Sequence, residues 1–196
     1  MWNFKTPGIP DELFERTEKV PITKEEVRVI QISKARLQPN QIVYDIGCGS
    51  GSISIEAAIQ VESSGKILAI DYDKNAIELT KKNAKKFQIE NISCILGNAK
   101  EKIIDLEPAD AIFVGGTGGD TAKIVELSQN KLKPGGRIVI GTIQIETLYA
   151  VLQVLEKLDF TSIDITQVTI SKSRKTSTGT MMLARNPVTI ISATKS

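Results

Sequence analysis

A glycine-rich turn directly after a short apolar run is the feature that most constrains this chain. Residues 43–51 read Val-Tyr-Asp-Ile-Gly-Cys-Gly-Ser-Gly, with glycines at alternate positions. The apolar run 42–46 predicts a strand buried on both faces of a parallel sheet, and the glycines let the backbone turn sharply against a ligand. Ligands of open α/β sheets bind at the carboxyl ends of strands, where Asp45 is expected. The segment therefore predicts a nucleotide-binding turn, with an ordinary tight turn as the alternative.

The glycine spacing and two acids separate two classes of cofactor. A dinucleotide fingerprint has the spacing G-x-G-x-x-G, whereas this turn has G-x-G-x-G after Asp45, an acid that would repel a pyrophosphate but suits an ammonium group. A second strand, 66–70, precedes Asp71, which is placed to accept hydrogen bonds from ribose hydroxyls, although NAD enzymes share such an acid. These residues resemble motif I and the following acid of class I S-adenosylmethionine-dependent methyltransferases. The resemblance implies S-adenosylmethionine as the cofactor.

Composition excludes several other classes of protein. The 25 basic and 23 acidic residues leave a net charge of +2, too little for bulk nucleic-acid binding. The first residues lack the pattern of a signal peptide, and no apolar run is long enough to span a membrane, so we expect a cytoplasmic protein. The two cysteines fit a reducing compartment, with Cys48 as a small filler beside the ligand, and the absence of histidine removes the commonest general base and metal ligand. We expect no metal site.

Alternating helical and strand patterns predict an α/β chain with parallel strands. Thr23 is expected to cap the first helix, with Glu26 completing a capping box, and Asp73 to cap a later one. The sequence 133–136, Lys-Pro-Gly-Gly, is expected to separate a helix from a strand. Helices are expected over 24–36, 53–59, 73–87, 120–132 and 146–158, and strands over 42–46, 66–70, 92–96, 109–114 and 137–140.

The last strand-like segments, 160–171 and 180–193, have no helix between them and are expected to pair as a hairpin. The whole pattern matches a Rossmann-like class I methyltransferase fold, with a seven-stranded, mostly parallel sheet and a C-terminal antiparallel hairpin. We expect residues 1–196 to form a single domain. Within it, residues 1–36 form an N-terminal lid and helix, and residues 160–196 form the hairpin.

Two further segments are candidates for substrate binding. Gly115-Gly116-Thr117-Gly118-Gly119 follows the fourth strand, where this fold borders the methyl-acceptor pocket, and it lacks the Asn/Asp-Pro-Pro-Tyr/Phe sequence that grips an exocyclic amine. Basic residues gather in 171–179, which is either a solvated hairpin tip or part of a clamp for a polycarboxylate. Arg16, Lys24 and Arg185 are the further candidates for such a clamp.

A narrower resemblance covers nearly the whole chain. It rests on residues 8–14, residues 21–28, the glycine run after the fourth strand, and residues 179–188, which read Gly-Thr-Met-Met-Leu-Ala-Arg-Asn-Pro-Val. Together these segments resemble the decarboxylating cobalt-precorrin-6B methyltransferases of cobalamin biosynthesis. The resemblance implies methylation of carbon 15 of a cobalt corrinoid, loss of carbon dioxide from the carbon 12 acetate, and a homotetramer. No catalytic acid or base is assigned.

The turn pattern and this resemblance together give a set of expected site residues. Asn98 is expected to read the adenine amino group in place of the usual acid, or else to be a turn residue. The expected cofactor-binding residues are Thr23, Asp45, Gly47, Cys48, Gly49, Ser50, Gly51, Asp71, Asn98 and Ala99. The expected substrate-binding residues are Gly115, Gly116, Thr117, Gly118, Lys172, Arg174, Lys175 and Arg185. Two alternatives stay open: a methyltransferase acting on tRNA or another small molecule, and a non-enzymatic cofactor-binding or assembly module.

Overall fold

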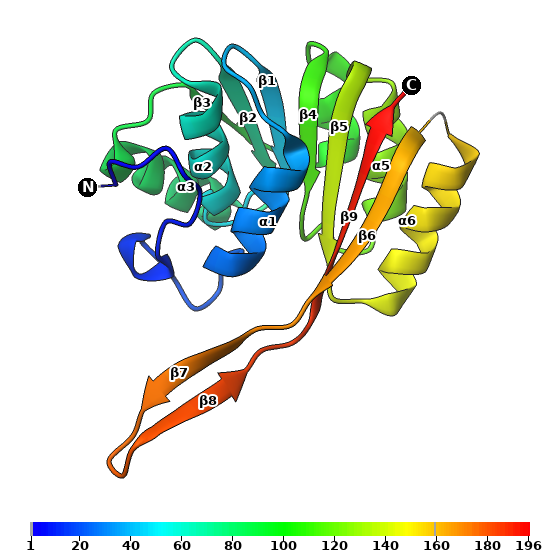
Figure 1. Cartoon of the computed structure of the whole chain (residues 1–196). Helices are drawn as coiled ribbons and strands as arrows, with labels where there is room; N and C mark the ends of the chain where they lie inside the picture. The colour runs from blue at the N-terminus through cyan, green and yellow to red at the C-terminus, as the bar shows by residue number, and fades with distance from the viewer. Residues whose placement is uncertain (1, 159) are drawn as a thin grey trace.

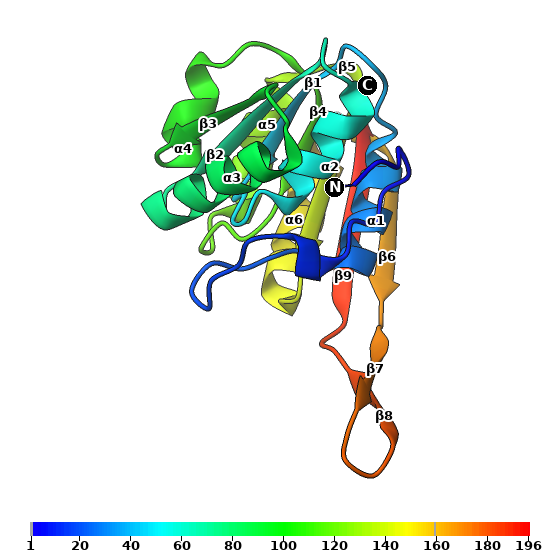
Figure 2. The same ribbon diagram turned by 90° about the vertical axis from the view of Figure 1, so that its left-hand side faces the viewer.

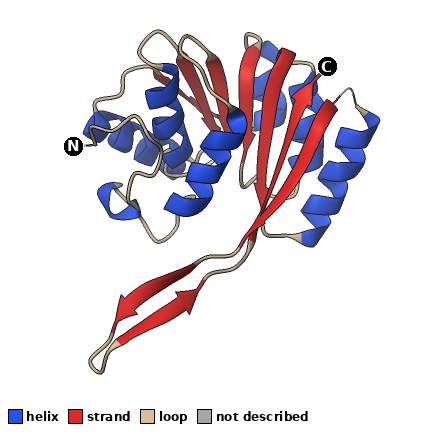
Figure 3. Cartoon of the chain, viewed as in Figure 1, coloured by secondary structure: helices blue, strands red, loops and turns tan. Residues whose placement is uncertain are grey.

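A seven-stranded sheet with helices on both faces forms the body of the protein (Figures 1 and 3). The computed structural model describes residues 2–158 and 160–196, so Met1, at the start of the expected lid, lies outside them. The strand order is β3-β2-β1-β4-β5-β9-β6, in which β5 and β6 each pair antiparallel with β9 and the other pairs are parallel. The predicted mostly parallel sheet with a terminal antiparallel hairpin is therefore confirmed.

The elements follow one another in alternation until the last helix. The strands of the sheet are β1 (Ile42–Ile46), β2 (Lys66–Asp71), β3 (Ile92–Leu96), β4 (Ala109–Val114), β5 (Leu132–Thr142), β6 (Phe160–Val168) and β9 (Val188–Lys195). The α-helices are α1 (Glu25–Ala35), α2 (Ser52–Val61), α3 (Lys74–Phe87), α4 (Ala99–Lys102), α5 (Thr121–Gln129) and α6 (Ile145–Lys157). Short 3-10 helices, η1 (Asp11–Leu13) and η2 (Ile103–Asp105), complete the body.

Side chains that alternate along the central strands pack into two separate hydrophobic cores, one on each face of the sheet. Tyr44 and Ile46 of β1 pack with α5 and α6, whereas Val43 packs with α1 and α2 on the opposite face. Strands buried on both faces explain why the sequence of β1 and β4 is almost continuously apolar rather than alternating. No described helix combines the length and the apolar character that crossing a membrane would require.

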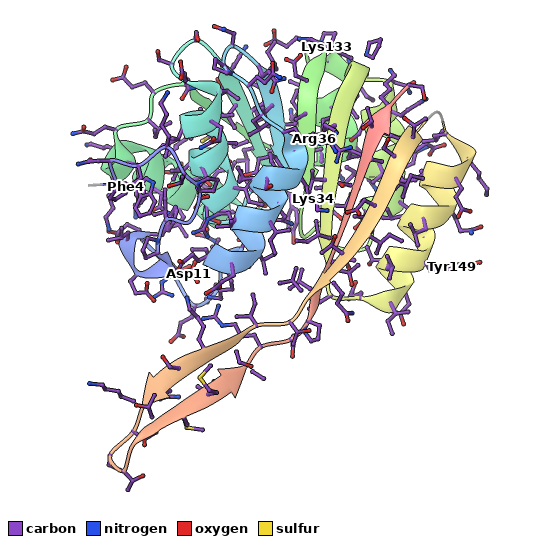
Figure 4. All side chains as sticks on the ribbon, viewed as in Figure 1. Phe4, Asp11, Lys34, Arg36, Lys133 and Tyr149 are labelled. Carbon is purple, nitrogen blue, oxygen red and sulfur yellow. The ribbon has the colours of Figure 1, made fainter. Side chains whose placement is uncertain are left out.

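The start of α1 differs from the expected capping box. The N-cap is Lys24, and no side chain of the cap residue accepts a hydrogen bond. Instead the Glu25 amide donates to Asp11 Oδ1 at 3.0 Å, so a carboxylate from the N-terminal segment does the capping (Figure 4). The prediction for Thr23 and Glu26 is wrong because a residue distant in sequence satisfies the helix terminus. The prediction for Asp73 is confirmed, since it accepts from the Asn75 amide at 2.8 Å.

A fully buried arginine fastens the N-terminal segment to the body. Arg28 Nε donates to Glu56 Oε1 at 2.6 Å, and Nη1 donates to Asp11 Oδ1 at 3.3 Å. Glu56 also accepts from the amides of Gly8 and Ile9 at 3.1 and 2.9 Å. Because each buried charge has a partner, the segment before α1 is held against α1 and α2.

β5 begins earlier than the sequence indicated. Its first residue, Leu132, pairs with Ala109, and the register then shifts so that Arg137 pairs with Ala111. The Lys-Pro-Gly-Gly sequence therefore lies inside an irregular part of β5, with Gly135 at a φ of +77°. The expected helix over 120–132 ends at Gln129, and the strand expected from residue 137 starts at residue 132.

The C-terminal hairpin begins in the main sheet and continues beyond it as a separate two-stranded arm. β6 and β9 pair within the main sheet, while β7 (Ser171–Lys175) and β8 (Thr180–Ala184) form a two-stranded sheet of their own. Figure 2 shows this arm extending well beyond the body of the molecule. The two strand-like segments expected in the sequence are therefore each divided into two strands.

Candidate functional site

The loops after β1 and β4 meet at the carboxyl edge of the sheet, where the strand order reverses direction. From β1 the chain proceeds through β2 to β3 on one side, whereas β4 and β5 lie on the other side. A side chain at Gly47 would place its Cβ only 2.7 Å from the Gly116 carbonyl oxygen, and one at Gly115 would lie 3.1 Å from the Gly47 oxygen. Glycine is therefore required for the two loops to approach so closely. This switch point is where open α/β sheets bind their ligands.

The turn after β1 needs glycine for its backbone conformation as well. Gly47 and Gly49 have φ values of +73° and +55°, in the left-handed region that other residues rarely adopt. A Cβ at Gly49 would lie 2.8 Å from the Pro21 carbonyl oxygen. That same oxygen accepts from the Ser50 amide at 3.2 Å. The N-terminal segment thus contacts the outer side of the turn through Pro21.

Asp71, at the end of β2, holds the turn from the other side. Its Oδ2 accepts from the Gly49 amide at 3.0 Å, and its Oδ1 accepts from the Asp73 amide at 2.9 Å. A carboxylate has about four acceptor positions, so two hydrogen bonds leave capacity for a ligand. Asp71 therefore holds the turn after β1 and also presents free acceptor positions at the open edge of the sheet.

A cavity of about 250 Å³ lies at this edge. Its walls combine backbone of the two loops with a carboxylate at β2 and apolar side chains of the adjoining elements. The lining residues are Ile46, Gly47, Ile70, Asp71, Tyr72, Gly97, Asn98, Ala99, Gly116, Thr117, Gly118, Asp120 and Ile124. The structure thus brings together part of the set expected from the sequence.

Other expected cofactor residues lie around this cavity without lining it. Gly49 and Gly51 lie within the turn, and Ser50 Oγ and Cys48 are buried beside it. Burial is the main cause that raises the pKa of Cys48, so its thiol stays protonated and agrees with the role of a small filler. Thr23 lies in the segment before α1 and does not line the cavity.

Asp45 lies beneath the turn and not in the cavity wall. Its side chain is 2% exposed and faces α2, where Ser54 Oγ donates to Oδ2 at 2.5 Å. Burial raises the pKa of Asp45 to about 6, while the Ser54 hydrogen bonds oppose the rise and the nearby Asp71 adds to it. Asp45 is therefore in a position to support the turn, with α2 between its carboxylate and solvent.

Asn98 acts as a helix cap in this structure. Its Oδ1 accepts from the Lys100 amide at 3.0 Å and so starts α4 beside the cavity. This contact corresponds to the second interpretation of Asn98, that of a turn residue, although Asn98 also lines the cavity. Ala99, next in the chain, contributes an apolar surface there.

Six lining residues were not among the site residues expected from the sequence, and two of these six, Tyr72 and Asp120, have polar side chains. Tyr72 is 71% exposed and directly follows Asp71, so its position after the second strand was the available signal. Asp120 follows the glycine run and forms an ion pair with Lys100 at 2.7 Å. This ion pair joins the start of α4 to the start of α5 across the cavity.

The basic residues of the expected clamp lie outside the cavity. Lys172, at the base of the arm, forms ion pairs with Glu26 and Glu25 at 2.5 and 3.3 Å, and the hydrogen bond with Glu26 raises its pKa. Arg185 lies 4.0 Å from both Asp11 and Glu26. Arg174 and Lys175 are exposed on β7, and Lys24 lies 3.7 Å from Asp11, while Arg16 is exposed. The base of the arm is thus attached to α1 by charges that already have intramolecular partners.

This strand order, with a ligand cavity between the loops after β1 and β4, defines the fold of the class I methyltransferases. A family model described as a precorrin methyltransferase domain matches residues 12–195. The chain belongs to this precorrin methyltransferase family.

Relatives of known name agree with this assignment. A protein of Saccharolobus solfataricus, named "probable cobalt-precorrin-6B C(15)-methyltransferase (decarboxylating)", is 45% identical over 196 residues, covering 99% of this chain and 98% of that one. The crystal structure of precorrin-6y C5,15-methyltransferase from Geobacter metallireducens has a TM-score of 0.89 at 34% identity, covering 97% and 99% of the two chains. That of precorrin 8W decarboxylase from Methanobacterium thermoautotrophicum has a TM-score of 0.89 at 35% identity, covering 94% and 98%.

Asp45→Asn tests the buried carboxyl, because the amide keeps an acceptor for Ser54 but does not titrate. In the folded wild type the pKa is raised from 3.8 to about 6, so the unfolded chain loses its proton first as the pH rises. The wild type therefore loses stability between about pH 4 and about pH 6, and the variant should gain roughly 3 kcal/mol relative to it over that range. Urea denaturation across the pH range measures this difference, and a difference that does not change with pH would contradict the assignment.

Proposed function

We propose that this protein uses S-adenosylmethionine to methylate carbon 15 of cobalt-precorrin-6B and removes the carboxyl group of the carbon 12 acetate as carbon dioxide, giving cobalt-precorrin-7. The observation that carries the proposal is the cavity at the switch point, closed by Asp71 and two glycine loops, in a chain of the precorrin methyltransferase family. The names of the relatives supply the substrate and both chemical changes. The reaction belongs to cobalamin biosynthesis.

The residues that line the cavity suit a ligand that contains adenosine. Asp71 keeps free acceptor positions for ribose hydroxyls, Ala99 and Ile124 offer apolar contact for adenine, and Gly47 exposes backbone to the amino-acid end. The turn residues Cys48, Gly49, Ser50 and Gly51 keep this backbone in place, with Asp45 below them and Thr23 in the covering segment. S-adenosylmethionine supplies a methyl group on a sulfonium, which an electron-rich carbon attacks without a strong base.

The loop after β4 offers the substrate a floor that is mainly backbone, since four of the five residues 115–119 are glycine. A Cβ built at Gly116, Gly118 or Gly119 would meet nothing within 4 Å, so open space lies above this backbone. A flat macrocycle can therefore come close to the cavity there, with Gly115 and Thr117 completing the floor. Because an electron-rich carbon attacks a sulfonium methyl without a strong base, the main contribution of this chain to methyl transfer is to hold the two reactants in position.

Product analysis tests the reaction directly. The purified protein, supplied with isotopically labelled S-adenosylmethionine and the corrinoid, should give one product that has gained the labelled methyl and lost carbon dioxide, as measured by mass spectrometry. Transfer of the label to tRNA, or no transfer to the corrinoid, would contradict the proposal. An identical incubation with the Asp71→Ala variant controls for methylation that does not depend on the cavity.

Substitution of Asp71 tests the cofactor site. Asp71→Ala removes acceptors from ribose hydroxyls and should weaken binding of S-adenosylhomocysteine by about 1–3 kcal/mol. Asp71→Asn keeps one acceptor oxygen and should have an intermediate effect, whereas Glu78→Ala, on the exposed side of α3, should have none. Calorimetry measures all three, and it should show no binding of NAD. An unchanged dissociation constant in folded Asp71→Ala would remove this residue from the site.

We further propose that the protein is a cytoplasmic homotetramer whose subunits meet through the β7–β8 arm. An isolated two-stranded hairpin is marginally stable in water, and this one exposes Met181, Met182 and Leu183 at 46%, 62% and 38%. Both thiols are free, which agrees with a reducing compartment.

Sedimentation velocity tests the assembly. The wild type should sediment as four chains, and the Met181→Asp, Met182→Asp double variant as a smaller species, because buried carboxylates at a subunit contact are costly. The Ser177→Asp, Thr178→Asp double variant, at the tip of the arm, adds the same charge outside the apolar surface and should leave the assembly intact. A wild-type protein that sediments as one chain would contradict the proposal.

A further inference from the structure

Two isoleucines at the junction of β5 and α6 are exposed, one in the connecting loop and one at the first position of the helix. Ile143 is 66% exposed and Ile145 is 79% exposed. Burial of a side chain of this size stabilises a protein, and these two side chains contribute no such stabilisation unless something covers them. We call these two side chains the apolar rim.

The apolar rim lies at the same edge of the sheet as the cofactor cavity. β4 and β5 are parallel neighbours with Val114 opposite Ile140, so the glycine floor and the segment 141–145 leave adjacent strands side by side. Figure 1 shows the start of α6 at this edge, below the ends of β4 and β5. A planar ring that rests on the glycine floor therefore reaches the apolar rim on its β5 side.

The segment that carries the rim is held by side-chain hydrogen bonds and has no charged residue. Thr142 Oγ1 accepts from the Gln144 amide at 3.0 Å, and Gln144 Oε1 accepts from Thr147 Oγ1 at 3.0 Å. Residues 141–145, Gly-Thr-Ile-Gln-Ile, contain no ionisable side chain.

We propose that the apolar rim covers the part of the corrinoid ring that bears the carbon 12 acetate and excludes water from its carboxylate. This inference rests on the proposed function. Carbon 15 is attached to the five-membered ring that contains carbon 12, so a substrate placed for methylation above the glycine floor has its acetate one ring width away. Water stabilises a carboxylate more than it stabilises the departing carbon dioxide, so an apolar surface favours the loss.

The chemical step balances without another reactant. The electron pair of ring carbon 15 forms the new bond to the methyl group, which leaves the ring cationic. The bond between the acetate methylene and its carboxylate then breaks, and its electron pair enters the cationic ring as carbon dioxide departs. The methylene takes up a proton from solvent and becomes a methyl group, while carbon 15 releases its own proton to solvent, so that the ring ends without the positive charge.

The Ile143→Thr, Ile145→Thr double variant tests this role, since it keeps β-branched side chains while adding hydroxyls. In single-turnover mass spectrometry the loss of carbon dioxide should slow by about tenfold or more, while methyl transfer changes less than about twofold. A methylated product that retains its carboxylate should therefore accumulate. Tyr149→Thr is the matched control, because Tyr149 is also exposed on α6 but points away from the sheet in Figure 4.

Two further measurements on the same variants separate the possible outcomes. The corrinoid dissociation constant should rise in the double variant, and its sedimentation should match that of the wild type. Unchanged decarboxylation, a parallel fall of both steps, or a smaller assembly would each overturn the proposal, the last by making the rim a subunit contact. If the wild type itself neither methylates nor decarboxylates the corrinoid, the proposed function fails instead.

Discussion

The close approach of Gly47 to Gly116 determines the geometry of the whole carboxyl edge. Since a Cβ at Gly47 would lie 2.7 Å from the Gly116 oxygen, only glycine lets the loops after β1 and β4 meet. Asp71 then holds the turn through the Gly49 amide, and Pro21 covers it from the N-terminal segment. The cavity and the glycine floor both depend on this arrangement. The cavity offers a ligand the backbone of the two loops and two carboxylates, those of Asp71 and Asp120.

Local signals predicted the sheet, but distant contacts decided the boundaries of its elements. The apolar runs of β1 and β4 and the glycines after them were sufficient to predict strands and turns. The cap of α1 was not predictable, because Asp11 reaches it from another part of the chain. The early start of β5 depends on pairing of Leu132 with Ala109, which overrides the turn-forming sequence that follows. The separation of the β7–β8 arm likewise has no local signal.

The site itself was partly predictable, because position after a strand carries information about function. Gly47, Asp71, Asn98 and Ala99 line the cavity as this rule indicates. Asp45 also lies near the end of a strand, but its side chain is buried against α2, on the face of the sheet opposite the cavity. For the basic residues of 171–179 the sequence left two interpretations, a solvated hairpin tip and a clamp for a polycarboxylate, because a sequence does not show the partners of a charge. In the structure Lys172 is already paired with Glu26.

The crystal structure of this protein with S-adenosylhomocysteine is the most direct test of the account. We predict that the ribose hydroxyls bind Asp71, that adenine lies beside Ala99, and that the amino-acid end lies against the glycine turn after β1. The glycine floor should remain open beside the sulfur atom, with the apolar rim next to it. A ligand bound away from the cavity between β1 and β4, or with its ribose turned away from Asp71, would contradict it.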